Sequence, residues 1–265
     1  DWDTVIAESR EDAPAIVFLV ENVDGTIIDQ VVAPATAGFN RVAWDLRYPS
    51  VEPWEPVPEG EEAHEGAGIL VIPGSYAVSM YKRVNGEMID LGQKQTFNVV
   101  SIRPDPAIEG SSQQQRVIFE AQVDELLRAA AGSSEAVDAV IGELDAVKAT
   151  LHRSMTDGSL YELAHSIQQS LKASNEKLTD NELRDAYNDL AIMSVQARLW
   201  HARFDPSSSA HGPTAAQKES LRIARKLYDE TVAELTQLVD GDYAALKEAM
   251  DIAKVPWTPG RGIQE

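Results

Sequence analysis

The chain of 265 residues contains no cysteine, which excludes disulfides, thiol catalysis and thiolate ligands to metals. It is also short of bases, because 23 Lys and Arg face 43 Asp and Glu and give a formal net charge of −20. Such a surface repels phosphate backbones and anionic lipid headgroups, so neither nucleic acid nor an anionic membrane surface is an expected partner. We interpret the acidity as a source of solubility rather than as a site for cationic ligands.

Long hydrophobic runs are absent as well. The longest, Ala15 to Val20, is far shorter than the roughly 20 residues that a membrane-spanning helix needs. The start has neither an initiator Met nor the basic-then-apolar pattern of a signal peptide, so we expect a mature form or a fragment of something larger. Hydrophobic residues at 43% and charged residues at 25% are typical of globular proteins, and the length allows one large or two ordinary domains.

The sequence also lacks recognisable catalytic and cofactor motifs. It contains no Gly-x-Ser-x-Gly elbow, no phosphate-binding loop and no dinucleotide fingerprint. None of its five histidines has a second histidine four residues away, and His201 lies on an apolar helical stripe that suggests packing rather than metal ligation. Carboxylates are so frequent that their spacing identifies no acid/base pair. We therefore expect no catalytic residue, no cofactor and no metal in this chain.

Residues 12–102 carry the signals of β-strands separated by turns. Residues 15–20 are apolar and β-branched, Asp24-Gly25 is a turn signal, and residues 26–32 return as a second strand. Asn85-Gly86 is the strongest short signal for a hairpin. Further strands are expected at 40–46, 73–84, 87–89 and 95–99. Several short strands with turns between them predict an antiparallel β-sandwich.

Two aromatic residues of this region invite a functional interpretation. Trp44 and Tyr76 could form a pair that stacks on a sugar. The alternation of their segments, however, places Trp44 beside Val42 and Leu46 on one face and gives Tyr76 apolar neighbours too. Core packing is therefore the favoured interpretation of both.

Residues 50–68 form a segment rich in proline and glutamate, with six glutamates and no base. These glutamates are Glu52, Glu55, Glu59, Glu61, Glu62 and Glu65. They could ligate Ca²⁺, but they have no regular ligand spacing, so a solvated surface loop is favoured. Trp54 lies in this loop without periodic partners, either as an exposed anchor or folded back onto the sandwich. Possible contacts to a ligand or partner are Trp54, Glu59, Glu61 and Glu62.

After Gly110 the hydrophobic period changes from two to about 3.6 residues, which is typical of helices. Gly132-Ser-Ser134 is expected to separate two helices, and Thr179-Asp-Asn-Glu182 is expected to open another as a capping box. Asp240-Gly-Asp242 is expected to turn the chain into the last helix. The helices are predicted at 114–131, 135–155, 159–173, 182–204, 214–239 and 242–253. Amphipathic helices joined by short loops predict an antiparallel bundle.

Several motifs of the first region resemble those of a known domain. Asp24-Gly25, Gly38-Phe-Asn40 with Trp44-Asp45, and Pro73-Gly74-Ser-Tyr76 resemble the Ig-like β-sandwich of the flagellar hook-capping protein. The same sandwich occurs near the C-terminus of many secreted bacterial proteins. The resemblance implies an Ig-like fold for this region.

The longer string Asn40-Arg-Val-Ala-Trp-Asp-Leu-Arg-Tyr-Pro49 is similar to the C-terminal region of bacterial BNR-repeat, sortilin-like β-propeller proteins, often labelled glycosyl hydrolases. In those proteins a helical region follows, with stretches like Pro213-Thr-Ala-Ala-Gln217 and Val239-Asp-Gly-Asp242. The resemblance covers most of residues 12–258. Since the chain has no blade repeats and no Asp-box, the enzyme label passes to no residue here. The resemblance implies an extracytoplasmic bacterial origin and an accessory role.

These observations together predict two domains, an Ig-like antiparallel β-sandwich at 10–104 and an antiparallel α-helical bundle at 112–254. Whether the helices form one bundle or pack on the sandwich stays open. The expected function is a non-catalytic C-terminal accessory or interaction module of a secreted bacterial β-propeller protein. Its expected partner is the propeller domain of the parent protein or another protein. The alternatives are a part of a carbohydrate-processing glycoside hydrolase and a carbohydrate- or Ca²⁺-binding module.

Overall fold

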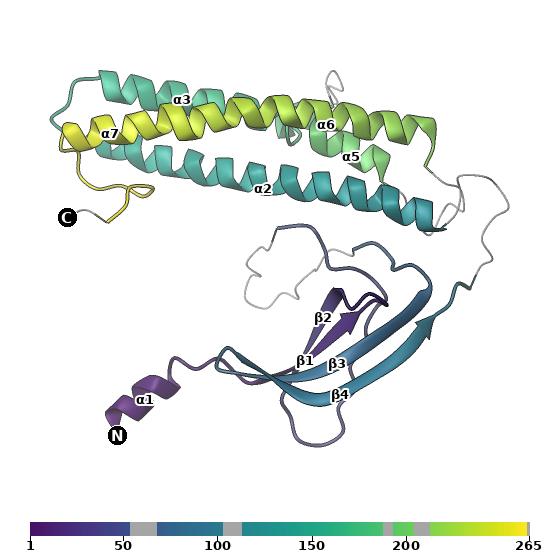
Figure 1. The fold of residues 1–265 in the computed structure, drawn as a ribbon. Helices are drawn as coiled ribbons and strands as arrows, with labels where there is room; N and C mark the ends of the chain where they lie inside the picture. The colour runs from purple at the N-terminus through teal and green to yellow at the C-terminus, as the bar shows by residue number, and fades with distance from the viewer. Residues whose placement is uncertain (54–67, 103–112, 188–192, 204–212, 264–265) are drawn as a thin grey trace. The chain divides into compact units, whose positions relative to one another are not determined.

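The computed structural model describes residues 1–53, 68–102, 113–187, 193–203 and 213–263 (Figure 1). The chain combines an antiparallel sheet with helices, as the two hydrophobic periods predict. It divides into two compact units. The first comprises Asp1–Ser50 and Val57–Ile118, and the second comprises Val51–Pro56 and Phe119–Glu265.

The first unit contains one four-stranded antiparallel sheet. Its strands are β1 (Ala15–Glu21), β2 (Ile27–Pro34), β3 (Gly74–Val84) and β4 (Glu87–Val99). They lie in the order β2-β1-β3-β4, so β2 and β4 are the edge strands. Each of the four coincides with a predicted strand or pair of strands, which confirms those predictions.

The turn residues account for the register of the sheet. Asn85 and Gly86 both adopt positive φ, 48° and 79°, as the predicted two-residue hairpin between β3 and β4 requires. Between β1 and β2, the Asn22 side chain accepts hydrogen bonds from the backbone amides of Asp24 and Thr26, both at 3.0 Å. Gly92, at φ 65°, accommodates the point on β4 where the register with β3 shifts.

The strand predicted at residues 40–46 is wrong. This segment has no regular secondary structure. The first β-type pairing after it is the isolated antiparallel bridge between Arg47 and Leu70. Leu46 has a φ of 65°, and the Asp45 side chain accepts a 3.0 Å hydrogen bond from the Arg47 amide. The local bond and the left-handed residue bend the chain, so the alternation of side chains persists without pairing.

A short helix that the sequence analysis does not predict precedes the sheet. It is α1 (Trp2–Glu8), with Asp1 as its N-cap. None of its seven residues is buried. The β-type periodicity of the following residues does not extend to this segment, whose apolar positions Trp2, Val5 and Ile6 have helical spacing.

The chain then forms α2 (Gln113–Leu151), a single helix of 39 residues that belongs to the second unit from Phe119 onward. The predicted break at Gly132-Ser-Ser134 is therefore wrong. The Ser133 hydroxyl donates a 2.8 Å hydrogen bond to the Ala129 carbonyl one turn earlier instead of capping a new helix. Buried residues on both sides of this point, Ala130 and Val137, belong to the same core, and their packing offsets the low helix propensity of glycine.

The prediction of a helix at 159–173 is confirmed by α3 (Ser159–Asn175). The single helix predicted from 182 to 204 is wrong, because the described part of that range contains two short helices, α4 (Glu182–Ala186) and α5 (Val195–Ala202). The Asn181 side chain accepts from the amides of Leu183 and Arg184, and Ser194 caps α5. The Thr179 hydroxyl lies 3.4 Å from the Asn175 carbonyl, and the side chain of Glu182, the other half of the predicted capping box, lies outside the described residues.

The last helical stretch begins at α6 (Ala215–Thr236), where Thr214 and Gln217 form a capping box. The turn predicted at Asp240-Gly-Asp242 is wrong. The chain continues through a π-helical segment, η1 (Gln237–Tyr243), directly into α7 (Ala244–Ile252). The wider π turn changes which side chains face the core, and it places Tyr243 inside, 1% exposed.

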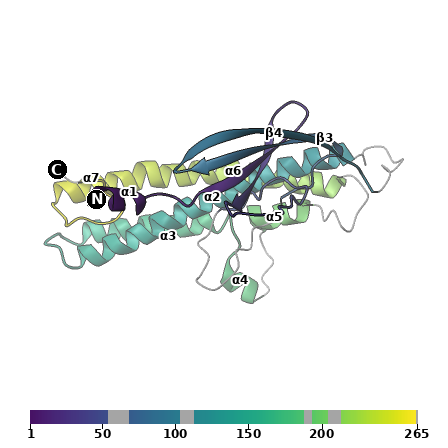
Figure 2. The ribbon, with the colours of Figure 1, turned by 90° about the horizontal axis from the view of Figure 1, so that it is seen from below.

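The helices of the second unit share one apolar core, to which α2, α3, α5, α6 and α7 contribute buried residues. Figures 1 and 2 show α2, α3 and α6 side by side, and Figure 2 shows α4 apart from them. Gln168 crosslinks α3 to α2, since its amide donates to the Ile141 carbonyl and the Asp145 carboxylate and its oxygen accepts from Lys148. None of the helices in the described ranges has the length and apolarity of a membrane span.

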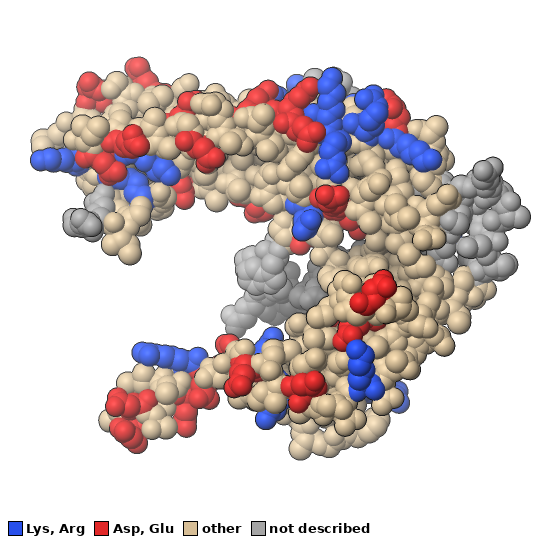
Figure 3. Space-filling view, viewed as in Figure 1, with Lys and Arg blue, Asp and Glu red and all other residues tan. Residues whose placement is uncertain are grey.

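The outer face of the helical unit is polar, with both signs of charge. Figure 3 shows acidic and basic side chains interspersed over its visible face. Ion pairs along α6 join Arg222 to Glu219 at 2.6 Å and Lys226 to Glu230 at 3.7 Å. Pairs of this exposed kind contribute little to stability, so we attribute the stability of this unit to its apolar core.

Candidate binding groove on the sheet

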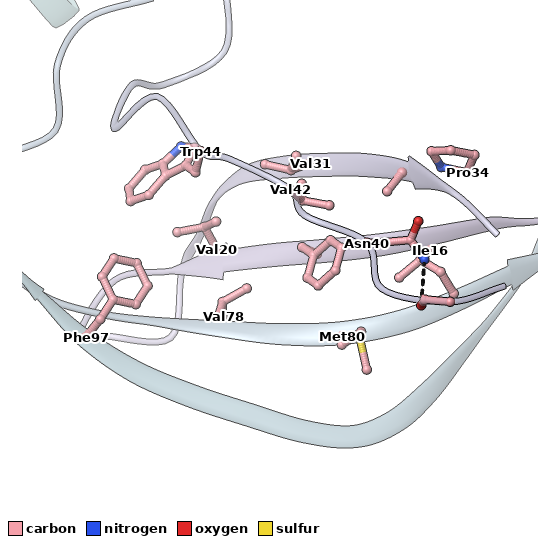
Figure 4. Close-up of a pocket in the computed structure, with 13 residues that line it drawn as sticks. Ile16, Val20, Val31, Pro34, Asn40, Val42, Trp44, Val78, Met80 and Phe97 are labelled. Atoms are coloured by element: carbon pink, nitrogen blue, oxygen red, sulfur yellow. Dashed lines mark hydrogen bonds between the residues drawn. The ribbon is translucent and has the colours of Figure 1, made fainter. Parts of the chain in front are cut away.

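One face of the sheet in the first unit carries an apolar cavity of about 550 Å³, which we call the sheet groove (Figure 4). The segment of residues 38–44 crosses over the strands and forms its roof. The groove is lined by Ile16, Phe18, Val20, Val31, Ala33, Pro34, Gly38, Asn40, Val42, Trp44, Val78, Met80 and Phe97. Its volume lies within the range of about 300–1,000 Å³ typical of ligand pockets.

The floor of the sheet groove follows from the alternation along the strands. Phe18 on β1 is paired with Val31 on β2 and with Met80 on β3. Residues that are directly opposite in an antiparallel pair lie on the same face, so these three side chains are neighbours. Val20 and Val78 form the next pair along the same face. The register of three strands therefore gathers apolar side chains into one continuous floor.

The roof is held in place by hydrogen bonds around Asn40. Its amide nitrogen donates to the Thr36 carbonyl at 2.8 Å and to the Gly38 carbonyl at 3.2 Å. Its amide oxygen accepts from the Thr36 hydroxyl at 2.7 Å. Gly38 has a φ of 102°, which favours glycine there. These contacts fix the bend from which Val42 and Trp44 extend over the floor.

One end of the sheet groove is closed by three aromatic rings. Trp44 meets Tyr76 edge-on at a centroid distance of 5.7 Å and Phe97 at 6.0 Å. The Trp44 indole donates to the Arg47 carbonyl at 3.1 Å, and the Tyr76 hydroxyl donates to the Ile72 carbonyl. Burial raises the pKa of the Tyr76 hydroxyl above its ordinary value. The polar atoms of this end are thus satisfied within the unit.

The interpretation as a core residue is confirmed for Tyr76 and only in part for Trp44. Tyr76 is 7% exposed and belongs to a buried cluster, against which Trp44 and Phe97 pack. Trp44 is half-buried, since one part of its ring also lines the sheet groove. The two rings touch each other rather than presenting parallel open faces, so their geometry suits packing better than stacking on a sugar.

The chemistry available in the sheet groove is that of apolar contact. Among its lining side chains, only Asn40 and Trp44 carry a polar atom, and both are already hydrogen-bonded within the unit. No lining residue is ionisable, so these residues supply neither an acid nor a base to a reaction. The groove therefore fits an apolar ligand or an apolar segment of another molecule.

The contact residues predicted from the sequence, Trp54, Glu59, Glu61 and Glu62, lie outside the described residues. They stay predictions. Of the six glutamates, Glu52 is described; burial raises the pKa of Asp124 on α2, and the charge of Glu52 adds a smaller rise. The buried Asp124 carboxylate lies 3.7 Å from Arg203, which opposes the rise. Within the described ranges, no three His, Asp or Glu side chains converge as a metal ion would need.

Sequence analysis did not identify the sheet groove, although residues 15–20 contain a signal for it. This strand is apolar at every position, whereas a strand with one solvated face alternates. An uninterrupted apolar strand needs cover on both faces. On one face of the sheet, residues 38–44 cover the apolar side chains only in part. The tertiary structure alone shows that this cover is partial.

Comparisons with known proteins do not add to this geometry: no protein-family model, no curated protein and no solved structure matches the chain. The site is therefore interpreted from its own residues.

Proposed function

We propose that this chain is a non-catalytic accessory module that binds another protein through the sheet groove. The observation that carries the proposal is the apolar floor formed by Phe18, Val31 and Met80 beneath an incomplete roof. Burial of apolar surface contributes about 25 cal/mol per Å², so an apolar segment of a partner gains free energy by entering it. A surface of this kind marks interaction sites on soluble proteins.

We propose further that the first unit is an Ig-like sandwich-type domain, near 10–104, and that the helices near 112–254 form an antiparallel bundle. The second layer of the sandwich would be the segment around residues 46–48. Its support is the pair of hydrogen bonds from the Val71 amide to the Leu46 carbonyl and from the Tyr48 amide to the Ile69 carbonyl, both 2.9 Å. The shared core of the helices supports the bundle.

The proposed partner is the β-propeller domain of a secreted bacterial protein to which the chain would belong. Support for this part of the proposal comes from the resemblance of residues 40–49 to the corresponding string in BNR-repeat, sortilin-like proteins. Trp44, which lies in that string, also lines the sheet groove. A docking role for the string would connect the resemblance with the site.

The alternatives have less support in the geometry. A carbohydrate site uses several unengaged polar groups beside an aromatic face, whereas the sheet groove has one amide that is already hydrogen-bonded. The glutamates proposed for Ca²⁺ lie mostly outside the described residues. A hydrolase would need two facing carboxylates in a cleft, and the lining of the sheet groove contains none.

Binding of the neutral dye Nile red tests the sheet groove with a matched pair of variants. Val42→Asp places a charge on the roof, at a side chain that is 37% exposed. The control Val32→Asp makes the same change on β2, where Val32 pairs with Val17 on the other face and is 47% exposed. We expect the affinity for the dye to fall at least tenfold in Val42→Asp alone. Equal affinities in the two variants would contradict the proposal.

The partner is tested with the propeller domain encoded in the same reading frame. Titration calorimetry should show binding to the wild-type chain and to Val32→Asp, and at least tenfold weaker binding to Val42→Asp. A reading frame without propeller blades would contradict the propeller part of the proposal. A glycan or Ca²⁺ that raises the melting temperature, while a propeller domain does not bind, would favour the alternatives.

A further inference from the structure

A second apolar surface of the first unit is unpartnered, and it belongs to helix α1. Trp2, Val5 and Ile6 follow the i, i+3, i+4 spacing of one helical face, and their exposed fractions are 79%, 51% and 44%. An isolated helix of seven residues is unstable in water, since nucleation is costly and such helices depend on packing of an apolar face. The helix α1 therefore needs a surface to pack against.

The sheet groove lies within reach of that helix. Residues 9–14 connect α1 to Ala15, the first residue of β1, and Ile16 already lines the groove. Extended at about 3.3 Å per residue, this connection spans roughly 20 Å. All of its residues are exposed, so no packing has to be broken for the helix to move.

The charges near the end of the groove are complementary to those of the helix. Lys82 on β3 pairs directly with Ile16, so both side chains lie on the groove face. Lys82 is exposed. Asp3 and Glu8 flank the apolar side of α1, so they would lie at the rim of the groove beside this base if the apolar side entered the groove.

We propose that α1 is the resident ligand of the sheet groove: Trp2, Val5 and Ile6 dock into it, and a partner protein must displace them. A ligand joined by a short linker has an effective concentration in the millimolar range, so the helix of the same chain outcompetes that of a second copy. The recognition is of the helix-in-groove type, with anchors at i, i+3 and i+4. This inference rests on the proposed function, because it concerns the occupancy of the same groove.

Nile red affinity measures the occupancy. In Val5→Asp/Ile6→Asp the apolar face is lost, while the matched control Thr4→Asp/Ala7→Asp adds the same charge on the opposite side of the helix. If α1 occupies the groove nine-tenths of the time, the apparent affinity of the groove for a competing ligand such as Nile red is reduced tenfold. We therefore expect the first variant to bind the dye about tenfold more tightly than the wild type and the control to bind like the wild type. Equal affinity in all three proteins would overturn the proposal.

A spin label identifies the occupant. Since the chain contains no cysteine, Thr4→Cys gives one unique attachment point on the polar side of α1. The label should broaden the methyl resonances of Ile16, Val31 and Met80, independently of protein concentration. Absence of broadening at the three groove methyls would overturn the proposal.

A mixed sample separates the two possible sources of the helix. It combines spin-labelled chain without isotope and isotope-labelled chain without spin label. Broadening in this sample would assign the occupant to a second copy and overturn the proposal of docking within one chain. Failure of this inference can be distinguished from failure of the proposed function, because the latter would appear as equal dye binding by Val42→Asp and Val32→Asp.

Discussion

The Tyr243 hydroxyl donates a 2.8 Å hydrogen bond to the carboxylate of Glu143 and so joins η1 to α2. The ring is 1% exposed, and the Lys247 ammonium lies 4.5 Å from its centroid. Burial is the main cause that raises the pKa of the Tyr243 hydroxyl, and the bond to Glu143 raises it further. Gly260, in the C-terminal tail, lies against the same pair.

Alkaline stability should depend on Tyr243. The folded state holds the phenol proton more tightly than the unfolded state. The protonated Tyr243 therefore makes its full contribution to the free energy of unfolding below the unfolded-state pKa of about 10, and this contribution is lost progressively as the pH rises above that value. Between pH 10 and 12 we expect Tyr243→Phe to lose stability less steeply than the wild type, by up to about 1.4 kcal/mol per pH unit. Urea unfolding at each pH measures this. Parallel pH profiles of the two proteins would contradict it.

Two neighbouring glycines offer a matched test of the tail. Gly260 has a φ of 78°, and an added methyl would lie 2.6 Å from the Tyr243 hydroxyl and closer still to Glu143. At Gly262 an added methyl meets nothing within 4 Å. We expect Gly260→Ala to cost about 1–3 kcal/mol and Gly262→Ala less than about 0.5 kcal/mol. Urea denaturation of both variants measures this, and equal costs would show that the tail does not pack on the pair.

Trp44 should contribute to the stability of the first unit less than a fully buried tryptophan does. Because it is half-buried, we expect Trp44→Ala to cost roughly 2–3 kcal/mol, at or below the lower end of the range of about 3–5 kcal/mol for complete burial. The control is Phe39→Ala on the same segment, where the ring is 91% exposed and the expected change is within about 0.5 kcal/mol. Far-UV circular dichroism, which does not require the tryptophan as a probe, measures the unfolding of both variants. An unchanged unfolding midpoint for Trp44→Ala would contradict the packing of Trp44 against Tyr76 and Phe97.

Acid sensitivity of the sheet should depend on Glu21. Its carboxylate accepts from Lys94 on β4 at 2.6 Å and from the Ser79 hydroxyl on β3 at 3.1 Å, and the Lys94 bond lowers its pKa below 4.5. Since the pKa is lowered in the folded state, the stabilisation is present above pH 4.5 and is lost as pH falls through the lower folded pKa. We expect Glu21→Gln to remove roughly 0.5–1 kcal/mol at pH 7 and almost nothing at pH 2.

The control for this pH dependence is Glu87→Gln, an exposed position at the start of the same sheet's edge strand β4. For each variant, we compare the denaturation midpoint at pH 7 with that at pH 2. The difference between the two midpoints should be smaller in Glu21→Gln than in the control. A separation as large as that of the control would show that the bond to Lys94 does not stabilise the sheet.

The candidate site shows where prediction from the sequence succeeds and where it ends. The alternation that places Val42 and Trp44 on one side was predicted, and both side chains do face the floor of the groove. The strand itself was not formed, because pairing needs a partner strand in register and Leu46 turns the backbone away. The groove depends on that difference, since a paired strand would have closed it.

The helical unit shows the same division. Each described helix lies where the 3.6-residue period predicted helix, but the positions of the breaks were wrong at Gly132, at Asp240 and after Ala186. Glycine and aspartate weaken a helix locally by at most about 1 kcal/mol each, which burial of neighbouring side chains readily offsets. Breaks are therefore decided by packing over the whole core rather than by the local residues.

The sequence by itself determined the two hydrophobic periods, the Asn85-Gly86 hairpin, the acidic surface and the absence of thiol chemistry, because each depends on composition or on side chains close together in the chain. Only the tertiary structure decided that residues 38–44 form a roof, that α2 runs unbroken and that an apolar face of the sheet stays open. These features depend on contacts between residues distant in sequence, such as Arg47 with Leu70 and Tyr243 with Glu143. A periodic pattern specifies which side of an element is apolar, whereas the folded chain specifies what covers it.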